Sequence, residues 1–331
     1  MRTYYTIFDK NYLFQGMTLW NSLKINSSRD FKLIVLAMDD IAAELLGNFT
    51  SKSLEVMPLS TIEDAWHRKI RSRVSVGQYC WIWQPLFAEH LLNNGHGEVT
   101  YLEADSMFFA DPEEIFESIG AFDLTLAPHN YSAKYEQSEI SGKYITHFNA
   151  VKNTSNGRQF LAHWRKCCLQ YSAAFPKSLC GQKGLDQVPS MGLGAVEITH
   201  PGVGVGPWNA PNWRFRIDQN GQMTVNGQRL VFYHFHEFAW TDLTSYRLVE
   251  SYKLPTFVVE HIYSKYISAL RDTIEMVNTI DESFNYRKIA PKPPKFKDAV
   301  LALLPTTTLL YLAALKASIK LGNRYLEMPV K

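Results

Sequence analysis

Residues 99–109, with the sequence VTYLEADSMFF, join a short apolar run to two closely spaced acids. The apolar run predicts a buried strand, and Asp111-Pro112 predicts the start of a helix soon after it. Alternate side chains of an extended segment share a face, so Glu103 and Asp105 can point to one place at the carboxyl end of the strand. Open α/β sheets bind ligands at that end, and two carboxylates there suit a hard divalent cation that would hold a diphosphate. The alternative is a strand that simply reaches solvent through two acidic residues.

Strand and helix patterns alternate from residue 1 to about residue 127. This alternation predicts an α/β fold with a mostly parallel central sheet flanked by helices. We expect residues 1–250 to form this domain and residues 251–331 to form a C-terminal helical extension. The predicted strands lie at 3–8, 32–37, 54–58, 99–102, 124–127 and 229–233, and the predicted helices lie at 16–25, 78–92, 156–172 and 257–280.

The composition is that of an ordinary globular protein, with 46% hydrophobic and 20% charged residues in a chain of 331. The formal net charge of +2 gives no argument for nucleic-acid binding. The four cysteines have neither zinc-like spacing nor the pattern of a secreted disulfide framework, which favours a reducing cytoplasm. The chain starts in a strand without a signal-peptide pattern, and its apolar runs are shorter than about 18 residues, so we expect no transmembrane helix.

Two further strand ends carry side chains that could bind a ligand. After the first strand, Asp9 could accept hydrogen bonds from a base or ribose, and the Tyr12 ring could stack on a base. The same pattern is also that of a structural helix cap. Residues 230–236 end in His234 and His236 at alternate positions, so both rings can face the same way. Neutral imidazole suits Mn²⁺ and tolerates Mg²⁺, although a purely structural pair is the alternative.

Several blocks of the chain resemble nucleotide-sugar glycosyltransferases of the GT-A fold, in particular bacterial members similar to glycosyltransferase family 8. Residues 101–112 read YLEADSMFFADP and are similar to the Y-L-D-A-D…F-F-x-D-P block of that family. Residues 200–209 read HPGVGVGPWN, which resembles H-P-G-x-G-x-A-P-W-N, and residues 233–236 read YHFH, which resembles the start of Y-H-F-H-G-L. Weaker matches lie at 8–16, 78–85, 144–151 and 180–189, and the blocks together span about residues 5–240.

The resemblance implies a Rossmann-like GT-A domain that moves a sugar from a UDP-sugar to an acceptor hydroxyl. It further implies retention of anomeric configuration, a glycan or lipid-linked acceptor, and a role in bacterial surface-glycan assembly, such as lipopolysaccharide or capsule. The implied cofactor is Mn²⁺ or Mg²⁺, held by Glu103, Asp105 and His234, with His236 as the next candidate ligand.

The resemblance also assigns residues to the donor, the reacting carbon and the acceptor. Gln182 would lie beside the anomeric carbon, with Asp186 as the runner-up in a second alignment register. Trp208 and Asn209 lie in the Gly- and Pro-rich loop, where Trp208 is either a packing anchor or a wall on the acceptor side. The implied donor-binding residues are Asp9, Tyr12, Glu103, Ala104, Asp105 and Asn149.

Three positions depart from the family pattern, and they support a rival interpretation. The family has Asp, Asp and Gly where this chain has Glu103, Gly181 and Glu237. A degenerate, non-catalytic GT-A domain that acts as a binding or scaffold protein at a membrane is therefore the alternative. A nucleotidyltransferase is the second alternative, but it would need a Gly- and basic-rich phosphate loop after the first strand, which residues 8–16 do not supply.

The last forty-odd residues change character. Residues 287–297 hold five basic side chains and no acid, and two strongly apolar stretches follow, interrupted by Pro305. A basic linker that leads into an apolar helix is typical of a segment lying in an anionic bilayer interface. We therefore expect a cytoplasmic protein that is peripheral at the inner face of the membrane, with docking onto protein as the alternative for the tail.

Overall fold

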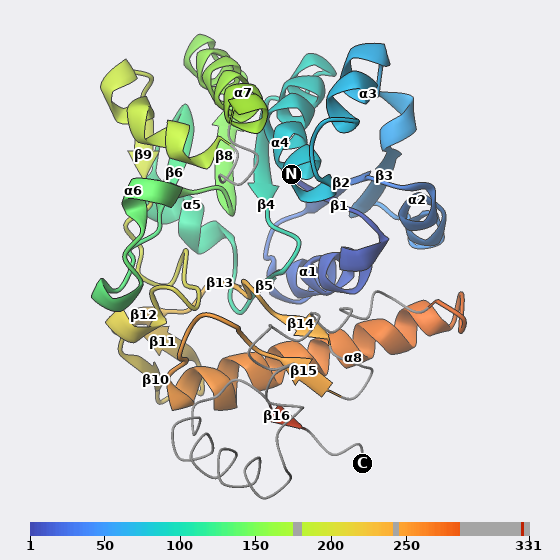
Figure 1. Ribbon diagram of the computed structural model, residues 1–331. Coiled ribbons are helices and arrows are strands. Elements are labelled where there is room, and N and C mark those ends of the chain that lie inside the picture. The colour runs from blue at the N-terminus through green and yellow to red at the C-terminus, as the bar shows by residue number, and fades with distance from the viewer. Residues whose placement is uncertain (175–180, 241–244, 285–325, 328–331) are drawn as a thin grey trace, which may run out of the picture.

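The computed structural model describes residues 1–174, 181–240, 245–284 and 326–327. Its centre is an eight-stranded sheet with the order β3-β2-β1-β4-β8-β6-β7, in which β9 pairs with β6 (Figure 1). The strands of this sheet are β1 (Arg2–Phe8), β2 (Phe31–Ala37), β3 (Leu54–Pro58), β4 (Glu98–Leu102), β6 (Leu124–Pro128), β7 (Tyr144–Ile145), β8 (Phe148–Lys152) and β9 (Ala195–Glu197).

The sheet is mostly parallel, as the sequence predicts. Strand β1 runs parallel to β2 and to β4, β2 runs parallel to β3, and β6 runs parallel to β9. Strand β8 lies antiparallel between β4 and β6. Strand β8 was not among the predicted strands. It has only five residues, between the polar pair Thr146-His147 and Asn153, and so short a run shows no clear strand pattern. The predicted α/β fold class is confirmed.

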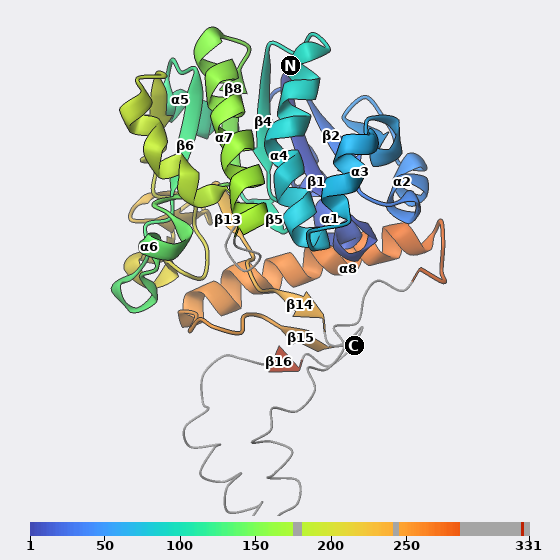
Figure 2. The same cartoon turned by 45° about the horizontal axis from the view of Figure 1, so that its top comes forward.

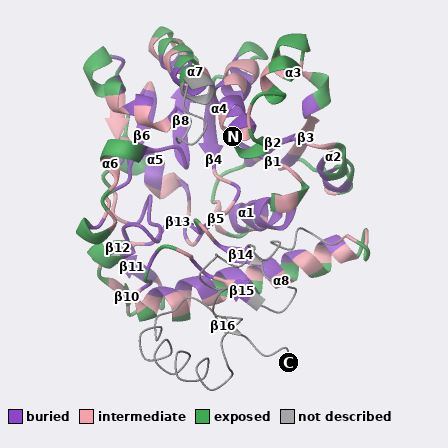
Figure 3. Ribbon diagram, in the orientation of Figure 1, coloured by how far each residue is buried: buried purple, intermediate pink, exposed green. Residues whose placement is uncertain are grey.

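Alternating side chains of the inner strands divide the interior into two cores. In β1, Tyr4 and Phe8 belong to one core, whereas Tyr5 and Ile7 belong to the other. This period of two is what strands buried on both faces require. Helices α1 (Leu13–Asn26), α2 (Asp40–Gly47) and α5 (Glu113–Ile119) contribute to the first core, and α4 (Val76–Asn93) and α7 (Ser155–Ala174) contribute to the second. Figure 2 shows α4 and α7 side by side on their face of the sheet, and Figure 3 shows the strands as mostly buried.

Helix α4 begins at a capping box and tolerates an internal proline. The Ser75 side chain accepts from the Gln78 amide, and the Gln78 side chain accepts from the Ser75 amide. Pro85 lacks the amide that would bond the Trp81 carbonyl, and the Cys168 thiol from α7 lies 3.7 Å from that carbonyl instead. The contact ties α4 to α7 at the proline.

A short antiparallel pair, β5 (Ser106–Phe108) and β13 (Phe232–His234), lies beside the main sheet. The predicted single strand at 229–233 is wrong: the chain leaves β12 (Gln228–Arg229) and then begins β13 in a different sheet. The break occurs because the amide of Leu230 bonds to Met223, whereas the amide of Val231 bonds across to Gly202. This crossing carries His234 to a position opposite Ser106.

The C-terminal part of the described chain packs against the first core. A π-helical segment (Val258–Tyr263) leads into α8 (Ser264–Asn278), which lies beside α1 along the edge of the molecule (Figure 1). The hydroxyls of Thr18 and Thr273 are 2.9 Å apart, and both helices contribute side chains to the same core. That core therefore continues across the domain boundary that we predict at residue 250.

The basic and apolar tail, which we expect to contact a membrane, lies outside the described residues except for 326–327. Within the described part of the chain, no helix combines the length and apolarity needed to cross a bilayer. The remaining elements are α3 (Ala65–Arg71), α6 (Ser138–Ser141), β10 (Phe215–Ile217), β11 (Met223–Val225), β14 (Ala239–Trp240), β15 (Ser245–Arg247) and β16 (Leu326–Glu327), with short 3₁₀ segments such as Lys10–Tyr12 and Gln182–Met191.

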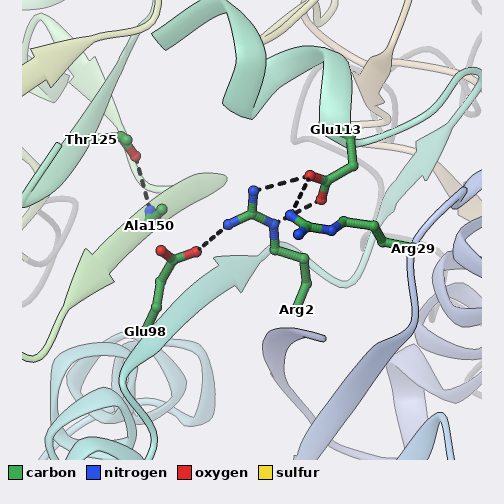
Figure 4. A network of polar contacts seen from close by, with 6 residues as sticks. All are labelled: Arg2, Arg29, Glu98, Glu113, Thr125 and Ala150. Carbon is green, nitrogen blue, oxygen red and sulfur yellow. Dashed lines mark hydrogen bonds and ion pairs between the residues drawn. The ribbon is translucent and has the colours of Figure 1, made fainter. Parts of the chain in front are cut away.

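An ion-pair network holds the amino ends of β1 and β4 (Figure 4). The Arg2 guanidinium donates to Glu113 at 2.7 and 3.0 Å and to Glu98 at 2.8 Å. Arg29 adds a second cation, 3.0 Å from Glu113. The network joins the start of β1 to the start of β4 and to α5.

Candidate active site

A cleft of about 820 Å³ opens at the carboxyl ends of β1 and β4. The parallel register of these strands, with Tyr4 opposite Thr100 and Tyr5 opposite Tyr101, brings the residues that follow each strand to the same edge. The cleft gathers most of the site residues predicted from sequence, although they come from segments more than 200 positions apart. Those that line it are Asp9, Tyr12, Glu103, Ala104, Asp105, Gln182, Trp208, His234 and His236.

Asp105 and His234 form the central polar contact of the cleft. The His234 Nε2 atom lies 3.0 Å from the Asp105 Oδ1 atom, and both side chains are largely buried. The backbone fixes this contact, because the amide of Phe235 donates to the Asp105 carbonyl at 2.8 Å. His236 is exposed on the cleft wall, with its ring 6.0 Å from that of Trp208. Of the two histidines predicted as ligands, His234 is the one that faces Asp105.

A chain of buried hydrogen bonds holds Glu103. The Tyr5 hydroxyl donates to the Gln84 carbonyl at 3.0 Å, and the Gln84 side-chain nitrogen donates to the Tyr101 hydroxyl at 2.8 Å. The Tyr101 hydroxyl in turn donates to Glu103 Oε2 at 2.9 Å. Glu103 has a longer side chain than the Asp of the pattern that it resembles. Hydrogen bonds through residues of β1, α4 and β4 hold this side chain in place.

The two acids of the motif differ in their electrostatics. Burial, followed by the neighbouring Asp105 charge, raises the pKa of Glu103 to about 7. Burial also acts to raise the pKa of Asp105, but the facing His234 more than offsets it, so the pKa of Asp105 lies below its ordinary value. For His234 burial acts to lower the pKa, and Asp105 more than offsets this, so the net shift is upward. Asp105 and His234 thus stabilise each other as an ion pair.

The charge of the cleft bears on which ligand it can hold. Among the described residues that line it, Asp9, Glu103, Asp105, Glu136 and Glu237 carry carboxylates, and none is Lys or Arg. An anionic diphosphate entering such a cleft would meet charge of its own sign unless a cation came with it. The carboxylates and imidazoles that line the cleft therefore fit a divalent cation that accompanies a diphosphate.

The described protein atoms alone do not make a complete metal centre. No three His, Cys, Asp or Glu side chains in the described part of the chain are gathered closely enough to hold an ion by themselves. Asp105 and His234 fit as two protein ligands, and Glu103 lies next to them but bonds to Tyr101. Mg²⁺ and Mn²⁺ sites commonly complete their coordination with substrate oxygens and water, which this open cleft can admit.

At the other side of the cleft, Asp9 and Tyr12 follow β1. Asp9 caps the short helix after it, because its carboxylate accepts from the Asn11 amide at 2.9 Å and from the Asn11 side chain at 2.7 Å. The structural-cap interpretation of Asp9 is thus correct, and the same carboxylate also lines the cleft. The Tyr12 ring is 46% exposed, which leaves its surface available for a planar ligand.

Gln182 reaches the cleft in a fully bonded orientation. Its side-chain nitrogen donates to the Ser141 carbonyl at 2.9 Å and lies 3.3 Å from His129 Nε2. Its oxygen accepts weakly from Thr146, at 3.3 Å from the amide and 3.4 Å from the hydroxyl. Burial lowers the pKa of His129 to about 3, so the imidazole is neutral and can accept from the amide. The oxygen of Gln182, with its long bonds, is the atom best able to turn to a ligand.

The neighbouring Gly181 has a backbone conformation and a packing environment that disfavour any side chain, including the acid of the pattern that this segment resembles. Gly181 has a φ of +76°, which side chains other than glycine adopt at a cost. A Cβ at this position would lie 2.3 Å from the Cys168 sulfur. The runner-up Asp186 does not line the cleft and instead accepts from the Lys143 amide at 2.7 Å and from Lys183 at 2.9 Å.

Trp208 and Asn209 anchor the Gly- and Pro-rich loop beneath the cleft. The Trp208 indole nitrogen donates to the His129 carbonyl at 2.7 Å, and the Asn209 side chain donates to the same carbonyl at 2.8 Å. Both side chains are buried, as a packing anchor requires. Trp208 still lines the cleft, whereas Asn209 does not.

Asn149 is buried in β8 and does not line the cleft. Its side-chain nitrogen donates to the Thr125 carbonyl at 3.3 Å within the sheet. The register of β8 against β4, with Asn149 opposite Tyr101, accounts for this position. Its predicted role at the donor stays a prediction.

Glu237, the third departure from the family pattern, has a φ of +66°. A glycine takes this conformation without strain, which explains the residue type in the family pattern. Here the Glu237 carboxylate accepts from the amides of Glu250 and Ser251 at 2.8 and 2.7 Å. These bonds hold the segment that brings Ser251 and Tyr252 to the cleft wall.

The sequence-based prediction missed several residues of the cleft. His129 directly follows β6, so the carboxyl-end rule that selected Glu103 could also have selected it. The others come from loops or helices whose placement depends on tertiary packing. These are chiefly Trp81, Tyr131, Tyr135, Glu136, Gln137, Ser141, Thr146 and Tyr252.

No protein-family model matches the chain. The uncharacterized protein YfnF of Bacillus subtilis (strain 168) is 26% identical over 293 residues, which cover 85% of this chain and 96% of YfnF. The uncharacterized protein YfnD of the same organism is 24% identical over 287 residues, covering 84% of this chain and 92% of YfnD. These relatives match nearly their whole length but carry no assigned activity.

A solved structure of the galactosyltransferase LgtC, in complex with donor and acceptor sugar analogs, resembles the chain at a TM-score of 0.49. The sequence identity is 10%, and the match covers 82% of this chain and 95% of that chain. Because the TM-score is below 0.5, we base the function on the geometry of the cleft.

Proposed function

We propose that the protein is a glycosyltransferase that moves a sugar from a UDP-sugar to an acceptor hydroxyl, with Mn²⁺ or Mg²⁺ as its cofactor. One observation carries this proposal: Asp105, between β4 and β5, and His234, at the end of β13, meet 3.0 Å apart in an acidic cleft of about 820 Å³ at the carboxyl end of the sheet. Hard cations prefer oxygen and imidazole ligands, and the acidic cleft needs a cation before it can hold a diphosphate.

The residues of the cleft divide between the parts of such a donor. Tyr12 presents an exposed ring to the base, and Asp9 offers a carboxylate to the base or ribose. Asp105 and His234 would hold the cation, with Glu103 beside them. When bound, a divalent cation supplies Lewis-acid stabilisation of a departing diphosphate.

Gln182 is the residue that we assign to the reacting sugar. Its amide is held by Ser141, His129 and Thr146, so its position is set before a ligand enters. A preorganised dipole next to a carbon that develops positive charge lowers the barrier without further reorganisation. Retention of anomeric configuration belongs to the proposal through the family resemblance alone.

The biological setting is part of the same proposal. The acceptor would be a glycan or lipid-linked molecule of bacterial surface-glycan assembly. Tyr131, Tyr135 and Tyr252 on the opposite side of the cleft supply the aromatic faces that sugars commonly contact. The basic tail at 287–297 would add attraction to an anionic membrane surface.

A donor screen tests the proposal directly. The full-length protein is heated with each of a set of UDP-sugars, with and without Mn²⁺, and release of UDP is measured in parallel. We expect one UDP-sugar to raise the melting temperature only when Mn²⁺ is present, and to be consumed slowly with water as acceptor. Stabilisation without any consumption, even with candidate acceptors, would favour the non-catalytic binding protein. Absence of stabilisation by every UDP-sugar would contradict the proposal.

A further inference from the structure

His147 joins the three segments that build the proposed metal site. It lies between β7 and β8 and is fully buried. Its carbonyl oxygen accepts from the Glu103 amide at 3.2 Å, so its backbone supports the first acid of the motif. Its side-chain Nδ1 lies 3.3 Å from the Nδ1 of His234, so its ring supports the histidine as well. A role for His147 is not part of the predicted or proposed site.

The Gly-rich loop makes the room that this imidazole occupies. Gly204 has a φ of +75°, and a Cβ at this position would lie 3.2 Å from His147 Nε2. The Trp208 ring packs next to both imidazoles, with its centroid 6.0 Å from that of His147 and 5.3 Å from that of His234. The loop that resembles the family block at 200–209 thus encloses the histidine pair.

The two facing Nδ1 atoms restrict where the ring protons can lie. A hydrogen bond between them requires a proton on one nitrogen and a lone pair on the other. In the metal-free protein the Nε2 atom of His234 faces the Asp105 carboxylate at 3.0 Å, so Nε2 carries a proton. A cation bound by His234 would need the lone pair of Nε2. That proton would then leave to solvent through the cleft, and the neutral ring would keep its proton on Nδ1.

We propose that His147 is a positioning residue that accepts the Nδ1 proton of His234, so that His234 offers the lone pair of Nε2 to a divalent cation. This inference rests on the proposed metal-dependent function. Without the acceptor, the Nδ1–H of metal-bound His234 would lose the partner that it faces in the structure, in a buried place where Trp208 packs against the His234 ring and Phe232 packs against the His147 ring. Such outer partners of metal-bound histidines are commonly worth about 10- to 100-fold in affinity.

Three substitutions separate this role from packing. His147→Phe keeps a planar ring but removes the acceptor. His147→Asn places an amide oxygen near the position of Nδ1 and keeps an acceptor. His90→Phe is the matched control, because it replaces another partly buried imidazole, one that packs against Phe87 on α4 and does not line the cleft. Thermal melting shows whether each full-length variant is folded.

The first measurement is a titration with Mn²⁺ in the presence of UDP, in which electron paramagnetic resonance reports free Mn²⁺. We expect about 10- to 100-fold weaker Mn²⁺ binding for His147→Phe, substantial recovery for His147→Asn, and wild-type binding for His90→Phe. Equal Mn²⁺ affinity in wild type and a folded His147→Phe would overturn this inference alone. If wild type with UDP does not bind Mn²⁺, the metal-dependent function itself fails.

The second measurement reports the ring protons directly. Long-range ¹H–¹⁵N spectra of protein labelled at histidine, with UDP and diamagnetic Mg²⁺, distinguish the two neutral forms of the ring. In wild type we expect Mg²⁺ to place the His234 proton on Nδ1. Retention of the proton on Nε2 in the Mg²⁺-bound protein would overturn the proposal, whatever the affinities.

Discussion

At the amino ends of β1 and β4 charges are matched, whereas at the carboxyl ends they are not. Arg2 and Arg29 face Glu98 and Glu113, with every contact at 3.0 Å or less (Figure 4). At the other ends of the same strands, Asp9 follows β1, and Glu103 and Asp105 follow β4. The cleft that they line collects five carboxylates among its described lining residues and no Lys or Arg. The same two strands therefore carry both arrangements, one at each end.

The difference separates a structural use of charge from a ligand-binding use. A pair that already has its partners gains nothing from a ligand, and its value lies in joining β1, β4 and α5. Buried carboxylates kept close together in a cleft oppose folding, and burial followed by the Asp105 charge raises the pKa of Glu103. Substitutions at the amino end should therefore affect stability alone, whereas substitutions at the carboxyl end should affect ligand binding or turnover.

The largest effect is expected for Asp105→Asn. The substitution removes one charge of the proposed cation site, so Mn²⁺-dependent UDP binding should fall by more than about 100-fold, which exceeds the usual effect of an outer partner. The free energy of unfolding should fall as well, because the largely buried His234 loses its carboxylate partner, so thermal melting must show that the variant is folded at the assay temperature. Calorimetry with UDP and Mn²⁺ measures the affinity, and Asp218→Asn, in an exposed turn, is the control. Unchanged affinity in Asp105→Asn would show that the motif does not hold a cation. By contrast, Glu103→Asp keeps the charge and should preserve Mn²⁺-dependent UDP binding.

The next effect concerns turnover and not binding. Gln182→Ala should lower the rate of transfer by about 100-fold while UDP affinity stays the same, because a preorganised dipole acts mainly in the transition state. Asp186→Asn should be milder, since that carboxylate is turned to Lys143 and Lys183 outside the cleft. Steady-state rates with the donor found in the screen decide between them. The opposite ranking would mean that the alignment register through Gln182 is wrong.

The sequence predicted the fold where local patterns and tertiary structure agree. The strands at 3–8, 32–37 and 54–58 match β1, β2 and β3 closely, because apolar runs buried on both faces are distinctive. The acids at 103 and 105 and the histidine at 234 were found because each follows or ends a strand. Strand β5 and the break before β13 were missed, because three-residue strands have no period of their own and depend on their partner.

The rest of the cleft could not be predicted from local patterns. The contact between His147 and His234 joins residues 87 positions apart, and the contact between Gln182 and His129 joins residues 53 positions apart. Neither is encoded by spacing: the first depends on how the loop at 200–209 packs against β13, and the second depends on how the segment Gln182–Met191 packs against residues that follow β6. The positive φ of Gly181 and of Glu237 likewise became interpretable only with the backbone in place.

At the amino end the expected effect is on stability. Arg2→Met keeps an unbranched side chain but removes the guanidinium that bonds Glu98 and Glu113 and lies over the Phe116 ring, so the free energy of unfolding should fall by about 2 kcal/mol. This value is below that of a fully buried pair, because the side chains are 14–23% exposed. Urea denaturation measures the loss, and Mn²⁺-dependent UDP binding should be unchanged. A variant that loses UDP binding while remaining folded would break the distinction between the two ends.

The same variant should change the response to acid. Burial acts to raise the pKa of Glu113, but the hydrogen bonds and charges of Arg2 and Arg29 together more than offset this, so the net shift is downward. A lowered pKa contributes stability above the unfolded value of about 4.3, and that contribution is lost as the pH falls through the folded value. In Arg2→Met the stability should therefore fall less steeply on acidification than in wild type. Parallel pH curves for the two proteins would contradict this assignment.

The smallest effect is expected at Glu237, a cleft carboxylate that bonds two backbone amides. Glu237→Gly removes two bonds to the amides of Glu250 and Ser251 but also relieves a φ of +66°, so its stability should lie within about 1 kcal/mol of wild type. Glu237→Ala loses the same bonds and keeps the strain, so it should be about 1 kcal/mol less stable than Glu237→Gly. Urea denaturation of the pair measures the strain alone, since both variants lack the carboxylate. Equal stabilities would show that the backbone at this position relaxes, and that the family glycine is not explained by its conformation.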